Sequence, residues 1–496
     1  MARSYLPVHR DQICLMPPDM RDWLPAEHLA WFVLDVVEKV NTSELHKRHP
    51  NSGAGRCAYD PTMLLALLIY AYCTGQRSSR QIERLCLTDV AYRVICGNNF
   101  PDHTTFARFR QNYDEIARSL FCDALELAEQ AGVSKVGLVA LDGTKMGASA
   151  SMKANASRDK IEAQVDEMMT QANLIDQDEN TLYGDRRGDE LPDELTDPQR
   201  RNAKLEAARD KLARAKRARQ NLDRREEERK TATTSERVDR WEEHKAARIR
   251  DVETTAAADQ AARQRGMNIP PEGSARHCRA AERLDKVNKR LEAAREAGAQ
   301  DNRDPQANIT DPDSRLMKTK DGFDQAYNAQ ADVNEAGIIV GADVSDDAND
   351  YNQFTNMMDV VAANLQAAGI KEKPGTVVAD AGYYSEENLK ASGPNRLIAT
   401  AKSYKMKQLP AVTGPPPVDP VEANAHRLAT QKGRDVYSKR QYMIEPVFGN
   451  TKANRGYRNF MRRGIEAVRA EWDLIMMTHN INKLHRLQLT KAAETP

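Results

Sequence analysis

The chain has 496 residues with 73 basic and 73 acidic side chains, and 40% of its residues are apolar. This length suffices for two to four domains, and the composition indicates a soluble protein with ample material for a core. The balanced charge excludes a uniformly basic nucleic-acid-binding protein but allows a local basic face. The longest apolar run, at 63–73, has 11 residues against the roughly 20 of a membrane span, and residues 1–12 lack an apolar signal region. We therefore expect no membrane association.

The cysteine pattern points to a reducing compartment. The seven cysteines form no CxxC pair, and six of them lie in the first quarter of the chain. An odd number without metal-ligand spacing indicates reduced thiols, so we expect a cytosolic protein. The residues are Cys14, Cys57, Cys73, Cys86, Cys96, Cys122 and Cys278.

Residues 1–130 carry repeated helix signals. Apolar residues recur at helical spacing over 23–40, and Asp60-Pro61 combines a good N-cap with a residue that suits the first helical position. Further helices are expected to open at Ser78 and at 101–105, the last running through 120. Such an all-helical unit could bind DNA or dimerise, and a purely structural helical bundle is equally consistent with the sequence.

The stretch 155–310 differs in composition from the rest of the chain. Residues 161–200 hold 12 acidic and 3 basic side chains, whereas 201–300 are net basic and rich in Ala, Arg, Glu and Lys. This pattern is typical of long solvated helices, and we expect a hairpin turn near 270–273. A DNA-binding or dimerisation arm and a charged spacer explain it equally well, and we expect the acidic part to be partly disordered.

Strand signals flank this stretch. The apolar run 136–141 fits a buried central strand that ends at Asp142. Two further runs, 327–333 and 338–344, enclose a short turn with Gly337 and predict a hairpin. A helix over 351–369, strands at 376–379 and 396–400, and helices from 437 to 490 complete the order. The alternation of strands and helices indicates an α/β core.

Three carboxylates stand out in this core. Asp142 and Asp380 each follow a short buried-type strand, and sites in open α/β sheets form beyond the carboxyl ends of strands. If the two strands are neighbours, both side chains project into one cleft. The third is Glu445. Because Pro446 is tolerated only in the first turn of a helix, we expect Glu445 at a helix start, where the dipole favours its ionised form.

Clustered carboxylates repel one another unless a cation joins them. Hard oxygen ligands suit Mg²⁺ or Mn²⁺, and two such ions can promote displacement at a phosphodiester. An Asp after a strand is more often a turn or cap residue, however, so spacing alone does not establish a site.

Five stretches carry a family resemblance. They are Leu-Asp-Gly-Thr-Lys at 141–145, Val-Val-Ala-Asp-Ala-Gly-Tyr-Tyr-Ser at 377–385, the block Tyr437/Arg440/Glu445/Lys452, and the accompanying stretches 60–110 and 320–350. In this order they resemble a DDE transposase of a bacterial insertion sequence. The resemblance implies a ribonuclease-H-like mixed sheet at 131–154 and 311–490, an all-α N-terminal domain at 1–130, and a charged helical insertion at 155–310.

The resemblance also implies roles for single residues. Asp142, Asp380 and Glu445 would be the catalytic residues and hold two Mg²⁺ or Mn²⁺ ions, and Tyr437, Arg440 and Lys452 would contact the DNA backbone. Six residues separate Glu445 from Lys452, as in the family pattern. Four separate Arg440 from Glu445, where the family has three.

The implied activity is DNA transposition. Water would attack the phosphodiester at an inverted-repeat end and free a 3′-hydroxyl, which would then attack target DNA. The implied partners are double-stranded DNA and a second copy of the chain, and the implied place is the nucleoid of the bacterial cytoplasm. The alternatives are a domesticated descendant that only binds DNA, and a nuclease of the same fold without strand transfer.

The C-terminal part is a candidate DNA surface. Residues 431–496 hold 13 basic and 6 acidic side chains. Such a patch suits phosphate contacts, although an ordinary solvated helix face would look similar. The candidates in this patch are Arg455, Arg458 and Arg462, to which Lys145 and Lys402 near the predicted strands are added.

Overall fold

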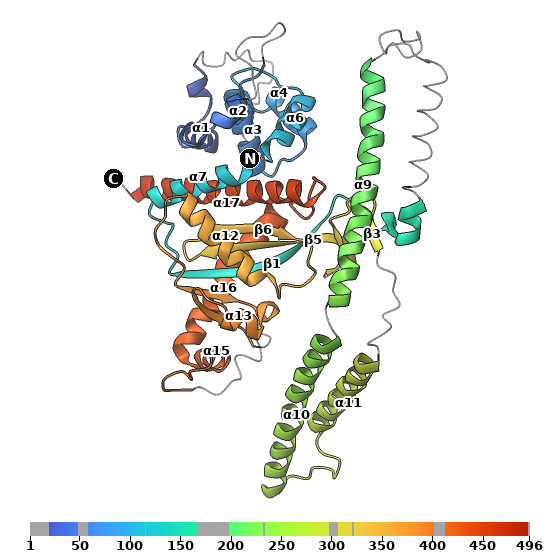
Figure 1. The fold of residues 1–496 in the computed structure, drawn as a ribbon. Helices are drawn as coiled ribbons and strands as arrows, with labels where there is room; N and C mark the ends of the chain where they lie inside the picture. The colour runs from blue at the N-terminus through green and yellow to red at the C-terminus, as the bar shows by residue number, and fades with distance from the viewer. Residues whose placement is uncertain are drawn as a thin grey trace, which may run out of the picture. The chain divides into compact units, whose positions relative to one another are not determined.

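The computed structural model describes residues 19–47, 58–114, 116–163, 165, 198–231, 234–296, 306–319, 322–400 and 412–494 (Figure 1). Lys402, Cys14, Cys57 and most of the acidic stretch 161–200 lie outside these residues. The chain divides into two compact units, Met1–Met152 with Asp313–Pro496, and Lys153–Pro312. None of the described helices is long and apolar enough to cross a membrane.

The N-terminal region is helical, as predicted. Its helices are η1 (Met20–Trp23), α1 (Leu29–Lys39), α2 (Ser43–Lys47), α3 (Pro61–Cys73), α4 (Ser79–Thr88), α5 (Val90–Ile95), α6 (His103–Tyr113) and α7 (Ala117–Gln130). Asp60 caps α3 by accepting a hydrogen bond from the Thr62 amide at 2.8 Å. Nearly all of α3 is buried, which agrees with its apolar sequence.

The helix predicted from 101–105 through 120 is two helices. α6 ends at Tyr113 and α7 begins at Ala117. The break separates two packing partners, because α6 packs on α3 and α4 whereas α7 packs on α17 (Ile465–Glu494) and α12 (Gln353–Ala367). Asp114, at the break, accepts hydrogen bonds from the Arg462 guanidinium.

A six-stranded mixed sheet forms the centre of the first unit. Its strands are β1 (Leu138–Gly147), β4 (Arg315–Thr319), β5 (Gly322–Asn334), β6 (Ile339–Ser345), β7 (Thr376–Ala379) and β8 (Asn395–Ile398). The order is β6-β5-β1-β7-β8, with β4 pairing the first part of β5. β5 is antiparallel to β1 and β6, and β7 is parallel to both β1 and β8. The predicted hairpin is confirmed as β5 and β6, and Gly337 has a φ of 79° in its turn.

The first strand is longer than its apolar run predicts. β1 does not end at Asp142 but continues to Gly147, because β5 pairs with it as far as Ala326. Its pairing with β7 stops at Ala140. Asp142 therefore lies within a strand, at the point where one neighbouring strand has ended.

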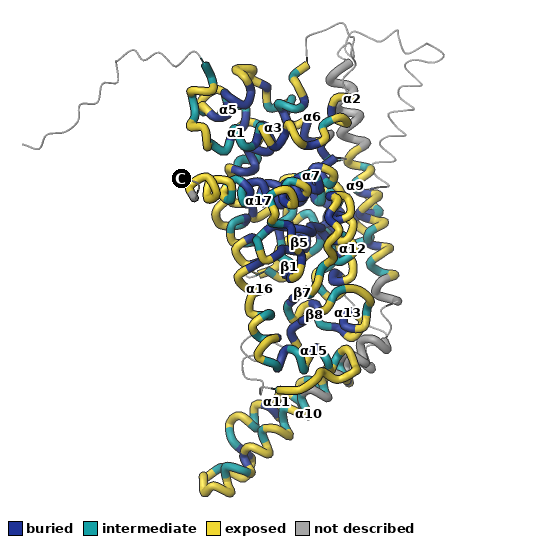
Figure 2. Tube along the Cα trace, turned by 90° about the vertical axis from the view of Figure 1, so that its left-hand side faces the viewer, coloured by how far each residue is buried: buried dark blue, intermediate teal, exposed yellow. Residues whose placement is uncertain are grey.

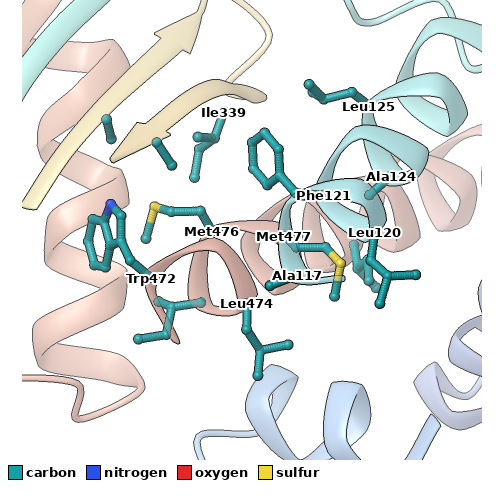
Figure 3. Packing of buried hydrophobic residues seen from close by; sticks show 14 of the residues in the cluster. Ala117, Leu120, Phe121, Ala124, Leu125, Ile339, Trp472, Leu474, Met476 and Met477 are labelled. Atoms are coloured by element: carbon teal, nitrogen blue, oxygen red, sulfur yellow. The ribbon is translucent and has the colours of Figure 1, made fainter. Parts of the chain in front are cut away.

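Helices cover the sheet and join it to the N-terminal region. α12, α15 (Pro420–Ala429), α16 (Gln431–Gly449) and α17 follow the hairpin in the chain, and η4 (Ala381–Tyr383) and α13 (Glu386–Lys390) lie between β7 and β8. Figure 3 shows Phe121 of α7, Met476 and Met477 of α17, and Ile339 of β6 gathered in one cluster. The sheet and the N-terminal helices thus share a continuous core.

Glu445 is not at a helix start. α16 runs through Pro446 to Gly449 and continues into a π-helical turn, Asn450–Asn454. Proline disfavours a helix interior because it lacks an amide donor, but here the buried side chains of Met443, Ile444 and Val447 hold both sides of Pro446 against the core. The predicted stabilisation of Glu445 by a helix N-terminus is therefore wrong.

The second unit contains the long charged helices. They are α9 (Pro198–Thr231), α10 (Thr234–Gln264) and α11 (Ala275–Glu296). α10 and α11 form the predicted hairpin, with the Ser274 amide donating to Asp259 at 2.7 Å and Gly273 at a φ of 101°. The described residues of α10 and α11 are mainly exposed or half-buried (Figure 2). β2 (Asn155–Ser157) pairs with β3 (Gln306–Asn308), and both contribute alanines to a small core with α9.

Candidate active site

The structure brings Asp142 and Asp380 together. β1 and β7 are neighbouring parallel strands in which Ala140 pairs with Val378. Asp142 and Asp380 each lie two residues beyond this pair, so their backbones emerge side by side. Each carboxylate is oriented by its own backbone hydrogen bond. Asp142 Oδ1 accepts from the Gly143 amide at 2.9 Å, and Asp380 Oδ1 accepts from the Gly382 amide at 2.8 Å.

The guanidinium of Arg440 lies between these two carboxylates. Its Nη2 atom is 2.8 Å from Asp142 Oδ2 and 3.8 Å from Asp380 Oδ2. Burial raises the pKa of Asp142 to about 6, the charge of Arg440 opposes this rise, and the charge of Asp380 adds to it. A positive group at this position thus favours the ionised form of Asp142. The half-buried ring of Tyr437 lies one turn before Arg440 on α16, and burial raises the pKa of its hydroxyl.

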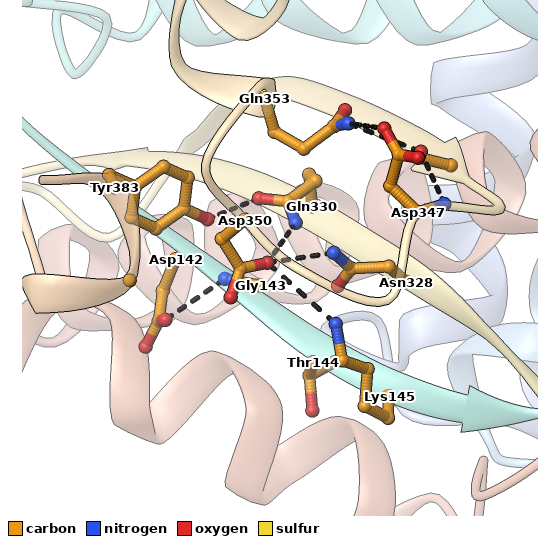
Figure 4. Close-up of polar contacts among 12 residues, drawn as sticks. Asp142, Gly143, Thr144, Lys145, Asn328, Gln330, Asp347, Asp350, Gln353 and Tyr383 are labelled. Atoms are coloured by element: carbon orange, nitrogen blue, oxygen red, sulfur yellow. Dashed lines mark hydrogen bonds and ion pairs between the residues drawn. The ribbon is translucent and has the colours of Figure 1, made fainter. Parts of the chain in front are cut away.

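A fourth carboxylate, Asp350, belongs to the same group of residues, although the sequence pattern does not single it out as a site residue. It lies in the loop between β6 and α12. Its Oδ1 atom accepts hydrogen bonds from Asn328 Nδ2 at 2.7 Å and Gln330 Nε2 at 2.8 Å, and Lys145 Nζ is 3.9 Å away (Figure 4). The Tyr383 hydroxyl donates to Gln330 Oε1 and extends this network.

Two glycines make room for these contacts. A Cβ atom on Gly143 would lie 2.4 Å from Gln330 Nε2 and 2.6 Å from Asp350 Oδ1. A Cβ atom on Gly382 would lie 3.0 Å from Asp380 Oδ1 and 3.3 Å from Asp350 Oδ2. The absence of side chains at these positions lets Asp350 approach both β1 and the turn that follows β7. The Asp-Gly-Thr and Asp-Ala-Gly motifs therefore have a packing reason as well as a chemical one.

Glu445 has an exposed side chain on α16, the helix that also carries Tyr437 and Arg440. In the part of the chain that the structure describes, no three His, Cys, Asp or Glu side chains are arranged as a metal site. The structure thus brings two of the three predicted carboxylates together and places the third on the helix that packs on β1, β5 and β7.

The predicted DNA contacts near the aspartates have internal partners as well. Lys452 Nζ donates to Thr144 Oγ1 at 2.6 Å and to the Lys145 carbonyl at 2.7 Å, which ties the π turn to β1. The Lys145 side chain is only 20% exposed, and burial lowers the pKa of its ammonium. Lys402 lies outside the described residues.

Arg455 is a structural residue rather than a member of a basic surface. It is 8% exposed, and its guanidinium donates to Thr478 Oγ1 at 2.9 Å and to the Ile475 carbonyl at 3.2 Å. Its charge satisfies polar groups between the π turn and α17, so the predicted contact with DNA is not supported by the structure. Sequence spacing could not reveal this burial.

The other arginines of the predicted patch differ from one another. Arg462 pairs with Asp114 at 2.5 Å, whereas Arg458 has an exposed side chain. Tyr457 and Phe460, which interrupt the arginines in the sequence, are fully buried. Of the three arginines predicted for the basic surface, Arg458 is exposed, whereas Arg455 is buried and Arg462 is paired with Asp114.

Comparisons with known proteins identify two regions of the chain. Residues 18–112 match a family model described as a transposase domain (DUF772), and residues 415–485 match one described as a transposase DDE domain. Searches of the curated proteins and of the solved structures gave no match. The second region contains Tyr437, Arg440, Glu445 and Lys452. A DDE domain implies a ribonuclease-H-like fold, and the mixed sheet has the corresponding strand order. A transposase domain followed by a transposase DDE domain fits a DDE transposase of an insertion sequence.

Proposed function

We propose that this transposase cleaves the inverted-repeat ends of an insertion sequence and joins the freed 3′-hydroxyl to target DNA. The observation that carries the proposal is the pair of carboxylates on neighbouring strands with a positive group between them. Asp142 Oδ2 lies 2.8 Å, and Asp380 Oδ2 3.8 Å, from the same Arg440 nitrogen. Such a pair is suited to bind a cation that neutralises both charges.

The donor set fits hard divalent ions. Asp142 and Asp380 offer oxygen ligands, and the guanidinium of Arg440 marks a position that favours positive charge. We propose that Asp142, Asp380 and Glu445 hold two Mg²⁺ or Mn²⁺ ions. Bound there, these ions would supply Lewis-acid activation of the attacking and leaving oxygens of a phosphodiester.

The side chains have separate roles in this proposal. Asp142 and Asp380 are oriented by the backbone amides of Gly143 and Gly382, so their Oδ2 atoms are held on the side of Arg440. Glu445 supplies a third carboxylate from α16, where its exposure leaves it accessible to a ligand. The reaction needs no covalent protein–DNA intermediate, because the successive nucleophiles are water and a 3′-hydroxyl.

Positive groups around the carboxylates are proposed to hold the DNA backbone. Arg440 and Tyr437 lie on α16 beside the Asp142 carboxylate. Lys452 contacts Thr144 and Lys145 further along β1, and Arg458 is exposed beyond the π turn. Phosphate contacts position DNA without reading its sequence. Lys402 is a further proposed contact, on the strength of its place in the sequence.

The remaining regions are proposed to recognise ends and to assemble the protein. The N-terminal helices at 1–130 and the charged helices at 155–310 are candidates for binding inverted-repeat DNA and for forming a homodimer. The second unit presents basic side chains such as Lys216 and Arg219 on exposed positions of α9. We propose that the protein acts on DNA in the bacterial cytoplasm.

A strand-transfer assay tests the proposed function against its alternatives. The probe is a labelled element end that already carries a free 3′-hydroxyl, incubated with a plasmid target and Mg²⁺. Joining of the label to the plasmid supports the transposase. Cleavage of an uncut end without joining favours a nuclease, and DNA binding without either reaction favours a domesticated descendant.

A further inference from the structure

Asp350 is held as firmly as the two predicted aspartates, yet the family resemblance assigns it no role. Its Oδ1 atom is the acceptor of two amide hydrogen bonds, from Asn328 and Gln330 on β5. Both amide residues are fully buried. Two buried donors at 2.7 and 2.8 Å fix the orientation of the carboxyl group.

The second oxygen of Asp350 faces the turn that carries Asp380. A Cβ atom on Gly382 would lie 3.3 Å from Asp350 Oδ2 and 3.0 Å from Asp380 Oδ1. The two oxygens therefore flank one space of about the size of a methyl group. Carboxylate oxygens that face one space are the ligands that a hard divalent cation prefers.

A buried acceptor faces the same region from β5. Asn328 is fully buried, and its Oδ1 atom has no hydrogen-bond partner among the described residues. A Cβ atom on Gly143 would lie 3.0 Å from this atom and 2.6 Å from Asp350 Oδ1. Asn328 turns its amide nitrogen to Asp350 Oδ1, so its oxygen remains beside Gly143 as a buried acceptor without a donor among the described residues. An unpaired buried acceptor is costly, and its oxygen adds to the carboxylate oxygens gathered around Gly143 and Gly382.

We propose that Asp350 is a fourth carboxylate of the candidate site and that its Oδ2 atom shares a divalent cation with Asp380. This inference rests on the proposed function, because it assigns one more ligand to the same site. Asn328 and Gln330 are positioning residues that hold the ligand oxygen through its partner Oδ1. Gly382 is required as glycine because a side chain there would occupy the space between the two oxygens.

A Mn²⁺ titration of the full-length protein tests this inference without relying on activity. Electron paramagnetic resonance measures the Mn²⁺ that remains unbound at each step. The informative variant is Asp350→Asn, which keeps an oxygen acceptor for Asn328 and Gln330 but removes the charge. The matched control is Asp347→Asn, on the same loop, where the carboxylate accepts from Gln353 at 2.9 Å. We expect Asp350→Asn to weaken Mn²⁺ binding at least about tenfold and Asp347→Asn to leave it unchanged.

A second comparison tests whether Asp350 is a cation ligand or only the counter-ion of Lys145. In the Lys145→Met background, a ligand role predicts that Asp350→Asn still weakens Mn²⁺ binding by the same factor. Loss of the effect in that background would show that Asp350 only pairs with the ammonium 3.9 Å away, and would overturn the inference. Thermal unfolding of each variant without metal serves as the folding check, because a purely structural role is satisfied by asparagine.

The same titrations distinguish this inference from the proposed function. If Asp142→Asn and Asp380→Asn weaken Mn²⁺ binding but Asp350→Asn does not, the site stands and Asp350 is not part of it. If the wild type binds no Mn²⁺, or if Asp142→Asn and Asp380→Asn bind it as the wild type does, both proposals are contradicted.

Discussion

Arg440 and Asp142 form an ion pair at 2.8 Å between α16 and the central strand of the sheet. Both side chains are mostly buried, at 14% and 19% exposure. The pair joins the helix that carries Glu445 to the strand that carries the first aspartate. In the proposed site, the guanidinium lies between the carboxylates of Asp142 and Asp380 and balances their charge when no divalent ion is bound.

Replacement of Arg440 by glutamine is expected to destabilise the metal-free protein by about 2 kcal/mol, because Asp142 and Asp380 lose their shared counter-charge. A divalent ion can replace that charge, so Mn²⁺ should restore more stability to Arg440→Gln than it adds to the wild type. Urea unfolding with EDTA and with Mn²⁺ measures both effects. Arg469→Gln is the control, since Arg469 pairs with Asp343 at 3.0 Å, and its loss of stability should not depend on Mn²⁺. Equal losses for Arg440→Gln in both media would contradict the role of the guanidinium as a substitute for the cation.

Replacement of Gly143 by alanine should abolish DNA cleavage and cost about 2 kcal/mol of stability, since the new methyl group overlaps Gln330 and Asp350. These two side chains are bonded to each other, so neither can move without breaking the network. Gly137→Ala is a matched control in the same segment, because a Cβ there has nothing within 4 Å. Activity assays and urea unfolding of the two variants check this prediction, which fails if Gly143→Ala behaves as Gly137→Ala does.

Substitutions of Arg455 and Arg458 are expected to have different effects: the first lowers stability and the second weakens DNA binding. Arg455→Met should cost roughly 3 kcal/mol of unfolding free energy, because it leaves the buried acceptors on Ile475 and Thr478 without a donor. Arg458→Ala should leave stability within about 0.5 kcal/mol but weaken DNA binding and lower the salt dependence by about one phosphate contact. Urea unfolding and filter-binding at several salt concentrations measure the two effects. A normal salt slope for Arg458→Ala would remove it from the proposed surface.

His479 predicts a specific pH dependence of stability. Burial lowers its pKa from 6.5 to about 4, helped by the charges of Arg455, Lys483 and Arg486 and opposed by a hydrogen bond with the Gly337 carbonyl. The unfolded chain therefore takes up a proton that the folded chain rejects, so this contribution is complete above pH 6.5 and is lost as the pH falls toward 4. At pH 5 the loss amounts to about 2 kcal/mol.

The comparison variant for this histidine is His479→Gln, whose amide can still donate to Gly337. Between pH 7.5 and 5 the wild type should lose about 2 kcal/mol more than the variant does, as measured by urea unfolding. Buried acids such as Asp473, with a pKa raised to about 7, act in the opposite direction in both proteins and cancel in the difference. Parallel pH profiles for the two proteins would show that His479 is not responsible.

Five of the six strands of the central sheet and the meeting of two site residues could be predicted from the sequence, whereas the edge strand β4 could not. Short apolar runs ending near Asp142 and Asp380 identify strands, and the carboxyl ends of neighbouring parallel strands bring their following residues together. The position of Asp350 beside Asp142 and Asp380 could not be predicted from a local pattern. It depends on the loop between β6 and α12 packing against Gly143 and Gly382, which are distant in the sequence.

Two other differences show where local rules fail. Pro446 indicates a helix start by backbone chemistry, but packing of Met443, Ile444 and Val447 carries α16 through it. Arg455 looks like a surface charge among other arginines, but the π turn directs it against α17. In both cases tertiary contacts, which a sequence pattern does not contain, decide the outcome.

The proposal that Asp142, Asp380 and Glu445 together cleave DNA is tested most sharply with a labelled inverted-repeat end and Mg²⁺. The wild type is compared with Asp142→Asn, Asp380→Asn and Glu445→Gln, and DNA binding is measured in parallel. We expect nicking at the element end by the wild type and at least about a thousandfold slower nicking by each variant, with binding retained. Cleavage by any one variant at the wild-type rate would contradict the assignment of that carboxylate.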